Sequence, residues 1–331
     1  MRFEAPRVDM DAIFIESLRK TYGDTVALDD LSLSVGKGEI FGFLGPNGAG
    51  KSTAIDLMLN YTYPTSGRVT VLGHDAVSES RAVRRRVGVL SDGYALYDRL
   101  TGREHVETAI ELKDADDDPD AILERVGIAQ AADRPAGGYS KGMGQRLAFG
   151  MALIGSPDLL VFDEPSTGLD PTGVRTLRKI VQEEADSGVT VFFSSHDLDQ
   201  VEAVCDRVAI LNEGRLVALD TVDGLRDRLG TAARLLIDAD PLPDPDSLVG
   251  VDGVGSVAVE DGRLVADCEN GAAKFRVLSA ISDSEARLVD FETEATSLED
   301  LFAASLDGAV PSASINERSS GGGDIPVGVD A

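Results

Sequence analysis

The stretch GEIFGFLGPNGAGKSTAIDLML, residues 38–59, decides the fold of this chain. Its apolar run IFGFL is typical of a buried strand, GPNGAGKST follows, and an apolar segment compatible with a helix comes last. The middle part matches the pattern G-x-x-x-x-G-K-[ST], whose confirming context is a strand before it and a helix after it. The sequence therefore predicts a strand, a phosphate-binding loop and a helix in succession, within a parallel α/β fold.

This loop has the residue types that hold a nucleotide. Its glycines let the backbone take conformations closed to other residues and approach phosphate oxygens, while loop amides and the helix N-terminus direct positive charge at the anion. Lys51 can reach the β- and γ-phosphates of a nucleotide, and Ser52 can ligate Mg²⁺. A glycine-rich turn that binds nothing is the alternative, which the context disfavours. The candidate nucleotide-binding residues are Gly45, Pro46, Asn47, Gly48, Ala49, Gly50, Lys51, Ser52 and Thr53.

Two adjacent acids follow a second apolar run, in PDLLVFDEPSTGLDP, residues 157–171. Asp163 ends the run and is the candidate second ligand of Mg²⁺. Glu164 comes directly after it, where it can polarise a water against the γ-phosphate. Two solvated charges at a loop are the alternative, but one acid for the metal and one for the water is what nucleotide hydrolysis requires.

A third apolar run, in VTVFFSSHDLDQ (residues 189–200), ends at His196. An isolated histidine is more often structural than catalytic. Here it closes a strand at the sheet edge where ligands of parallel α/β sheets gather. We therefore expect His196 to contact the γ-phosphate.

The net charge of −27 is unusual for a chain of 331 residues. Such a surface repels DNA, RNA and anionic lipid, so no nucleic-acid partner is expected. With 58 acids, and only 7 Lys beside 24 Arg, the composition is typical of salt-accumulating microbes, in which concentrated salt screens the self-repulsion. Our hypothesis is that the source is a halophilic archaeon.

Charge and composition also divide the chain. Residues 231–331 hold 20 acids and 6 bases, a net charge of −14, whereas residues 1–230 hold 38 acids and 25 bases, a net charge of −13. The runs VGSVAVE and GRLVADCE in the acidic part predict strands. The expected units are an N-terminal extension over 1–12, a nucleotide-binding domain over 13–225, an acidic domain over 231–306 and a flexible tail over 307–331.

No apolar run approaches the roughly 18 residues that span a bilayer, and the start MRFEAPRVDMDAIF lacks the apolar core of a secretory signal. The chain is therefore expected in the cytoplasm, where it can still dock on a membrane protein. The two cysteines, Cys205 and Cys268, lie far apart and indicate two buried thiols rather than a disulfide framework or a zinc site.

One further motif indicates a family. GYSKGMGQRLAFGMAL, residues 138–153, resembles the L-S-G-G-Q signature of the ATP-binding subunits of ATP-binding cassette (ABC) transporters, in a variant YSKGM form. Ser140 and Gly142 match this signature. Tyr139, Lys141 and Met143 depart from its common form, as is frequent in the drug-export branch, which includes the daunorubicin-resistance subunits.

On physical grounds, a serine and a glycine before a helix also form a second helix N-terminus that can bind an anion. In the family this end, here Ser140, Lys141, Gly142 and Met143, serves the ATP of a partner in a head-to-tail dimer. Because the chain carries one copy of each motif, the resemblance implies a second ATP-binding subunit, most simply an identical one. ATP and Mg²⁺ are the implied substrate and cofactor.

The resemblance covers about residues 13–220 and carries over further positions. Tyr22 is similar to the aromatic residue that stacks on adenine, although a surface aromatic beside a turn is the alternative. Asp170 in STGLD resembles the acid of the loop that crosses the dimer interface. The closing TSLEDLFAASL, residues 296–306, resembles the end of the accessory domain in the drug-export branch.

The segment between Asp92 and Ser140 has 47 residues rich in helix-compatible stretches, which predicts a compact helical subdomain over about 93–150. It is far too short for the coiled coil of the chromosome-maintenance relatives. Translation-associated relatives carry two cassettes in one chain, and this chain has one. Both points, with the acidic surface, disfavour DNA- or ribosome-acting functions.

The resemblance implies an α/β fold: a P-loop NTPase core with a RecA-like parallel sheet and an antiparallel β subdomain, a helical signature subdomain and a small α+β C-terminal domain. The implied function is ATP hydrolysis that drives a separate polytopic membrane permease, most simply an exporter, at the cytoplasmic face of the membrane. A soluble non-transport switch and a module that binds ATP without turnover are the alternatives.

Asp92, in LSDGY (residues 90–94), is the most informative departure from the family pattern. The family usually has Gln at this position, at a strand end that faces the γ-phosphate. Asp is one methylene shorter and only accepts hydrogen bonds when ionised, so it can reach Mg²⁺ through a water. We expect Asp92 to sense the metal and the γ-phosphate and to link them to the permease; a turn without a catalytic role is the alternative.

Overall fold

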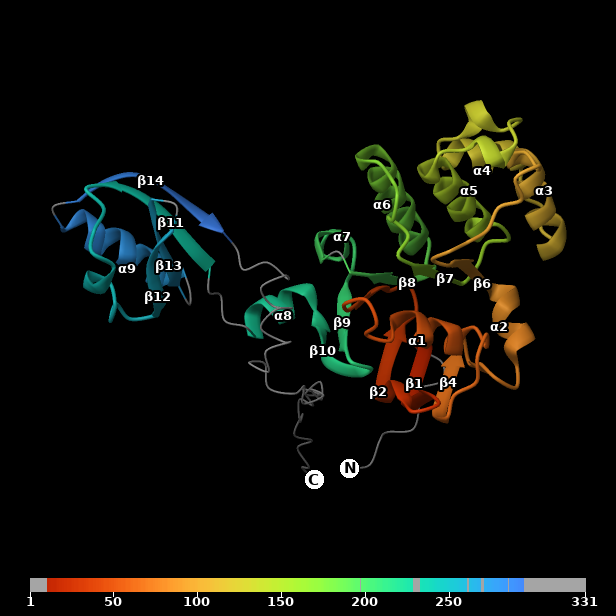
Figure 1. Ribbon diagram of the computed structural model, residues 1–331, viewed down its shortest axis with the longest axis horizontal. Coiled ribbons are helices and arrows are strands. Elements are labelled where there is room, and N and C mark those ends of the chain that lie inside the picture. The colour runs from red at the N-terminus through yellow and green to blue at the C-terminus, as the bar shows by residue number, and fades with distance from the viewer. Residues whose placement is uncertain are drawn as a thin grey trace, which may run out of the picture.

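The computed structural model describes residues 11–196, 198–228, 233–260, 262–268, 271–284 and 286–294. These residues form three sheets with helices around them (Figure 1). The first two sheets and their helices make up the part of the chain that contains the predicted nucleotide site. The third sheet belongs to the acidic C-terminal part.

The first sheet is antiparallel, which agrees with the expected β subdomain, and its order is β2-β1-β4-β5. Its first strand begins at Asp11, two residues before the boundary expected from the sequence. In the second half of β2, the alternate residues Leu31, Leu33 and Val35 are buried because one face of the sheet packs on the core. The strands are β1 (Asp11–Tyr22), β2 (Thr25–Gly36), β4 (Ser66–Val71) and β5 (His74–Asp75).

The second sheet has the order β10-β9-β3-β8-β7-β6, in which all pairs are parallel except β9 with β10. Its three central strands are buried along their whole length, which is why they appear in the sequence as continuous apolar runs. All three strands that the sequence predicts are confirmed. The strands are β3 (Ile40–Leu44), β6 (Val87–Leu90), β7 (Leu159–Asp163), β8 (Thr190–Ser195), β9 (Arg207–Asn212) and β10 (Arg215–Thr221).

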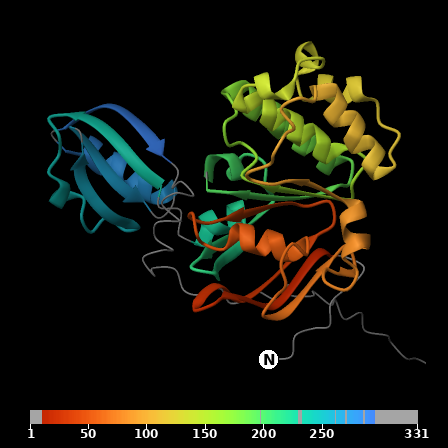
Figure 2. The same cartoon turned by 45° about the vertical axis from the view of Figure 1, so that its right-hand side comes forward.

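Helices and the first sheet cover the two faces of this parallel sheet (Figure 2). Phe162 and Phe193 point to the face covered by α3–α6, whereas Phe41 and Phe192 point to the face covered by α1 and the antiparallel sheet. The helices in this part are α1 (Lys51–Met58), α2 (Ser80–Arg86), α3 (Gly102–Lys113), α4 (Pro119–Arg125), α5 (Lys141–Leu153), α6 (Pro171–Asp186), α7 (Leu198–Glu202) and α8 (Val222–Arg228), with short 3₁₀ turns at η1 (Ala129–Ala131) and η2 (Ala136–Gly138).

The third sheet is antiparallel, with the order β12-β13-β11-β14, and helix α9 packs on one face of it over a core of its own. The two strands predicted here are confirmed as β12 and β13. The elements are β11 (Ala233–Asp240), η3 (Pro245–Ser247), β12 (Val254–Glu260), β13 (Arg263–Cys268), α9 (Gly271–Ser282) and β14 (Arg287–Glu294). Both cysteines are buried and free, as expected.

The closing segment 296–306 and the expected tail 307–331 lie outside the described residues. Within the described ranges, no helix is long and apolar enough to cross a membrane.

Candidate functional site

The candidate site lies at the carboxyl ends of β3, β7 and β8, where three loops meet. Parallel strands β3, β8 and β7 are neighbours in that order, so the residues that follow them gather at one edge. The sequence after β3 is the predicted phosphate-binding loop, and α1 begins at Lys51. This is the strand, loop and helix order that the sequence predicts.

Two glycines of the loop have backbone conformations that favour glycine. Gly48 has φ of +84° and Gly50 has φ of +105°, both in the left-handed region. A Cβ atom on Gly50 would also lie 2.6 Å from the Ala27 carbonyl oxygen of β2. A turn braces the loop from the other side, because the Gly214 amide donates to the Ala49 carbonyl over 2.9 Å.

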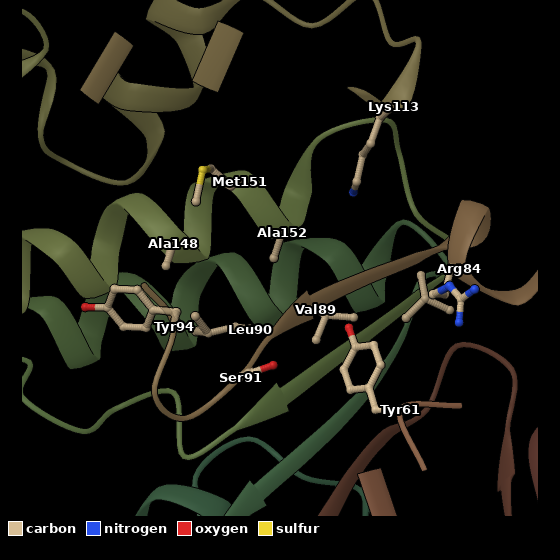
Figure 3. Close-up of a pocket in the computed structure, with 11 residues that line it drawn as sticks. Tyr61, Arg84, Val89, Leu90, Ser91, Tyr94, Lys113, Ala148, Met151 and Ala152 are labelled. Carbon is tan, nitrogen blue, oxygen red and sulfur yellow. The ribbon is translucent and has the colours of Figure 1, made fainter. Parts of the chain in front are cut away.

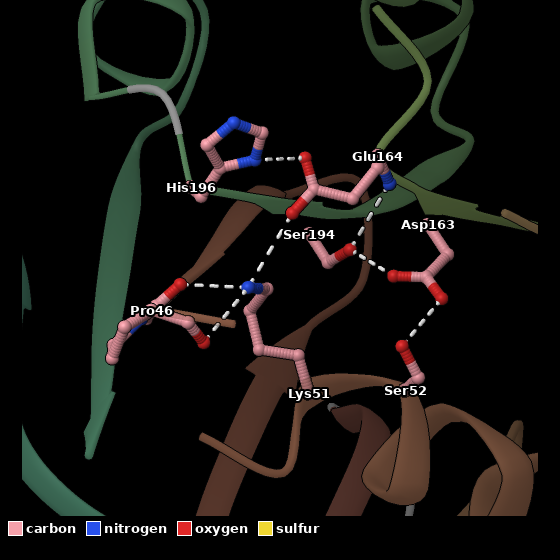
Figure 4. Close-up of polar contacts among 8 residues, drawn as sticks. Pro46, Lys51, Ser52, Asp163, Glu164, Ser194 and His196 are labelled. Carbon is pink, nitrogen blue, oxygen red and sulfur yellow. Dashed lines mark hydrogen bonds and ion pairs between the residues drawn. The ribbon is translucent and has the colours of Figure 1, made fainter. Parts of the chain in front are cut away.

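Lys51 is the buried cation of the site, with 6% of its side chain exposed. Its Nζ donates to the Gly45 carbonyl over 2.6 Å and lies 3.4 Å from the Pro46 carbonyl (Figure 4). The same atom lies 3.4 Å from Glu164 Oε1. The lysine thus lies beneath the loop, next to the acid expected to polarise water.

Ser52 and Asp163 form the candidate metal site. The Ser52 hydroxyl donates to Asp163 Oδ2 over 2.8 Å, across the gap between α1 and β7. A hydroxyl and one carboxylate are hard oxygen donors, and Mg²⁺ in proteins takes one or two such ligands with phosphates and water for the rest. The chemistry of this donor pair therefore fits a Mg²⁺ ion that is also held by the phosphates of a nucleotide.

Ser194 is a site residue that the sequence did not indicate. Its hydroxyl, fully buried at the end of β8, donates to the other carboxylate oxygen of Asp163 and accepts the Glu164 amide at 3.2 Å. One side chain therefore fixes the orientation of Asp163 and the start of the loop after it. A serine in an apolar strand is too common for its identity alone to predict this.

Glu164 is held in an uncommon conformation. Its φ of +51° lies in the left-handed region, which is unusual for a glutamate. Oε2 accepts from His196 Nδ1 at 2.7 Å when that nitrogen carries the proton, whereas Oε1 is buried and has no hydrogen-bond donor. The lysine at 3.4 Å is close enough for an ion pair but does not donate a hydrogen bond to Oε1. A buried acceptor without a donor can take one from a bound water.

The signature segment lies at the N-terminus of α5. Ser140 is the N-cap, and its hydroxyl accepts the Met143 amide at 3.2 Å. Gly142 was expected before the helix; in the structure the helix begins at Lys141, so Gly142 and Met143 lie in its first turn. A Cβ atom on Gly142 would lie 3.1 Å from the Gly168 carbonyl, so the glycine allows the loop after Glu164 to pack closely here.

Two polar contacts join α5 to this same loop. The buried Gln145 side chain donates to the Pro165 carbonyl over 2.9 Å, and Arg146 pairs with Asp170 at 2.6 Å. Asp170 is also the N-cap of α6, where it accepts the Gly173 amide. The Gly173 amide first and Arg146 second lower the pKa of Asp170. Within one chain, the acid predicted at a dimer interface therefore joins two helices.

The structure does not bring two of the predicted residues to this cluster. Tyr22 is half exposed at the end of β1, where Lys20 Nζ lies 4.6 Å from its ring centroid. Asp92 is exposed in a turn after β6, and the described residues give its side chain no hydrogen bond or ion pair. The contacts of the described chain alone assign neither residue a role.

Comparisons with known proteins decide the family. The family model described as "ABC transporter" matches residues 28–167. "Daunorubicin resistance ATP-binding protein DrrA3" of Streptomyces coeruleorubidus is 38% identical over 66% of this chain and 71% of that protein. The chain belongs to the ABC transporter family. "Daunorubicin/doxorubicin resistance ATP-binding protein DrrA" of Streptomyces peucetius is 33% identical over 88% of this ABC chain and 92% of its own length.

A solved structure titled "Structure of ATP binding subunit of ABC transporter" matches the ABC chain with a TM-score of 0.61 and 27% identity, over 66% of this chain and 93% of that one. The fold is that of an ABC ATPase cassette, and the chain is an ATP-binding subunit with ATPase function. Likeness to the second daunorubicin-resistance protein covers 88% of this chain and so extends beyond residues 13–220, the range that contains the family motifs.

Proposed function

We propose that this ATPase powers a separate membrane permease, most simply an exporter, and that Glu164 activates the water that hydrolyses ATP. The observation that carries the proposal is the Glu164 carboxylate. One of its oxygens is held by His196 and the other is a buried acceptor without a donor, beside Lys51 and next to the Ser52–Asp163 pair. The exporter assignment is supported by the names of the drug-resistance relatives.

Each residue has a distinct task in this proposal. The loop residues 45–53 hold the phosphates, with Lys51 between the loop carbonyls and the γ-phosphate. Ser52 and Asp163 would hold Mg²⁺, which when bound neutralises phosphate charge. Glu164 Oε1 accepts a proton from the attacking water, and His196 holds Oε2, so the carboxylate cannot rotate away. Tyr22 stacks on the adenine, and Asp92 approaches the γ-phosphate through water.

A second subunit, most simply an identical one, completes each site. The Ser140 hydroxyl accepts the Met143 amide, which leaves the amides of Lys141 and Gly142 in the first turn of α5 able to point at the ATP of the partner. Asp170 lies in the loop that joins the two chains. Binding of ATP by both chains favours the closed dimer, and loss of phosphate favours reopening, which the permease converts into transport.

A cavity of 340 Å³ between β6, α2, α5 and the end of α3 is where we place the permease contact (Figure 3). Its walls are apolar, and it is bordered by the loop that carries Asp92. The charged side chains among its lining residues are Arg84 and Lys113, and no acid lines it although the chain has 58. The cavity is thus lined by positive charge on a chain that is acidic overall. This favours a docking segment that is apolar and carries an acidic side chain.

The Glu164→Gln variant tests the catalytic assignment. The amide keeps the size of the side chain but cannot take the proton, so ATP turnover should fall by about 100-fold or more. ATP binding should persist, and an ATP-dependent dimer should accumulate in sedimentation experiments. The exposed Glu107→Gln on α3 is the matched control, because it makes the same change without a contact to the site. Unchanged turnover in Glu164→Gln would exclude Glu164 as the base.

Two alternatives predict different outcomes. A module that binds ATP without turnover would release no phosphate even where the wild-type chain dimerises with ATP. A soluble switch would not co-purify with a polytopic membrane protein.

Our further hypothesis of a halophilic source predicts that the free energy of unfolding rises between dilute buffer and molar KCl, and a flat profile would contradict it.

A further inference from the structure

We propose that Tyr94 is a positioning residue that links the cavity beside β6 to the signature turn of α5. The inference rests on the proposed function, in which that turn serves the ATP of the partner subunit. Tyr94 follows the exposed Asp92–Gly93 turn by one residue, but unlike that turn it is half buried and packs against the main core.

The hydroxyl end of Tyr94 reaches the start of the signature helix. Its Oη lies 3.4 Å from the carbonyl oxygen of Lys141, the first residue of α5. A Cβ atom built on Gly144 would lie 3.0 Å from this Oη and 3.7 Å from a carbon of the ring. Gly144 therefore provides the space into which the tyrosine fits, one turn after the Ser140 cap.

The other end of the same ring lines the cavity. Figure 3 shows Tyr94 at one side of it, with the hydroxyl directed away from the other lining side chains, which include Leu90, Ala148 and Met151. A segment that enters the cavity would contact the ring of Tyr94. Because the hydroxyl of Tyr94 touches the signature turn, a movement of the ring would also move this turn. The long contact to Lys141 is a weak hydrogen bond, so the ring packing contributes most of the link.

The loop that begins at Glu164 also holds the signature turn. Gly142 packs on the Gly168 carbonyl, and Gln145 donates to the Pro165 carbonyl. The loops that carry the two acids assigned to the γ-phosphate, Asp92 and Glu164, thus both contact the first turns of α5. Tyr94 provides one of these contacts, beside Leu96 of the same loop, and without its ring the turn loses part of the support that this loop gives.

The test compares Tyr94→Ala and Tyr94→Phe with the wild-type chain. Tyr94→Ala should lower kcat by about ten-fold, because displacement of a positioned group by about 1 Å is sufficient for such a loss. The Kd for ATP, measured with a fluorescent ATP analogue on the isolated chain, should change by less than about two-fold, since Lys51 and Ser52 remain in place. Tyr94→Phe keeps the ring and should retain most of the turnover.

Two further variants separate this role from a loss of stability. Gly144→Ala pushes on the tyrosine from the helix side and should reproduce the loss of kcat. Tyr97→Ala removes an exposed tyrosine from the same loop, which stacks on His105 rather than on α5, and should leave kcat unchanged. In the Glu164→Gln background, Tyr94→Ala should weaken the ATP-dependent dimer.

Equal kcat in Tyr94→Ala and the wild-type chain would overturn the inference alone. A parallel loss of ATP affinity and kcat would also overturn it, because a general structural defect would produce that pattern. Absence of turnover in the wild-type chain would overturn the proposed function, and the inference with it.

Discussion

Replacement of Ser194 by alanine should weaken metal-dependent catalysis, because it removes a contact to Asp163, the proposed metal ligand. In the wild-type chain the Ser194 hydroxyl donates to Asp163 Oδ1 and accepts the Glu164 amide. Without it, the Glu164 amide keeps its contact with the Ser194 carbonyl at 3.2 Å, but Asp163 Oδ1 loses this donor. Asp163 is then held by Ser52 alone among the contacts of the site.

The magnitude follows from these contacts. Loss of one buried hydrogen bond to a carboxylate should lower the free energy of unfolding by about 1–3 kcal/mol, which a domain of ordinary stability tolerates. Loss of the partner that orients a metal ligand should raise the Mg²⁺ concentration for half-maximal ATP turnover by about 10- to 100-fold. The measurement is ATP turnover as a function of Mg²⁺ at saturating ATP, together with urea unfolding.

The matched control is Thr190→Val, at the opposite end of the same strand. Thr190 is equally buried, and its hydroxyl accepts the Gly38 amide at 3.0 Å, so the variant should lose comparable stability. It should not change the Mg²⁺ requirement, because it lies away from Asp163. An unchanged Mg²⁺ requirement in Ser194→Ala, or an equal shift in the control, would refute the assignment of Ser194.

Three further predictions follow from single contacts. In urea titrations, Gly50→Ala should lower the free energy of unfolding more than Gly48→Ala does. Both variants add strain of about 1–2 kcal/mol at positive φ, but only the new Cβ at position 50 meets a backbone oxygen. Equal losses in the two variants would contradict this packing argument. Burial raises the pKa of the Glu39 carboxyl above 4.5, so the native chain binds the proton of this carboxyl more tightly than the unfolded chain does. The free energy of unfolding should therefore fall as pH rises from about 4.5. Glu39→Gln should remove this contribution to the pH dependence of the free energy of unfolding. Lys113→Glu should reduce co-purification with the permease, whereas Lys179→Glu on the exposed side of α6 should not, and equal effects would exclude a charge-specific contact.

The catalytic edge could be predicted from the sequence because each of its parts is local. The apolar runs before Gly45, Glu164 and His196 mark buried parallel strands, and such strands place the residues that follow them at one edge. The order of these strands in the sheet does not follow from their composition, because continuous apolar runs contain no information about neighbours. The expectation of a common edge depended only on the parallel direction.

The contacts between subdomains could not be predicted in this way. Tyr94 meets Gly144, and Arg146 meets Asp170, only because α5 packs at a particular angle across the sheet. Residue type gives no indication of either pair, since an aromatic beside a turn and an arginine on a helix are common on any surface. The role of Ser194 could not be predicted for the same reason, because it depends on the register of β7 and β8, which places Asp163 opposite Ser194.

The charge of the site gives a reason why its nucleotide should arrive with a metal. Lys51 is the buried cation beside Glu164, and Asp163 lies near a further acid, Asp56 in α1. Burial first and the charge of Asp163 second raise the pKa of Asp56, which indicates an environment that already disfavours negative charge. The phosphates of ATP add more of it than one lysine and the loop amides can offset. We infer that the Ser52–Asp163 pair favours the metal-bound nucleotide over the free anion, because Asp163 and Glu164 already give this edge of the sheet negative charge.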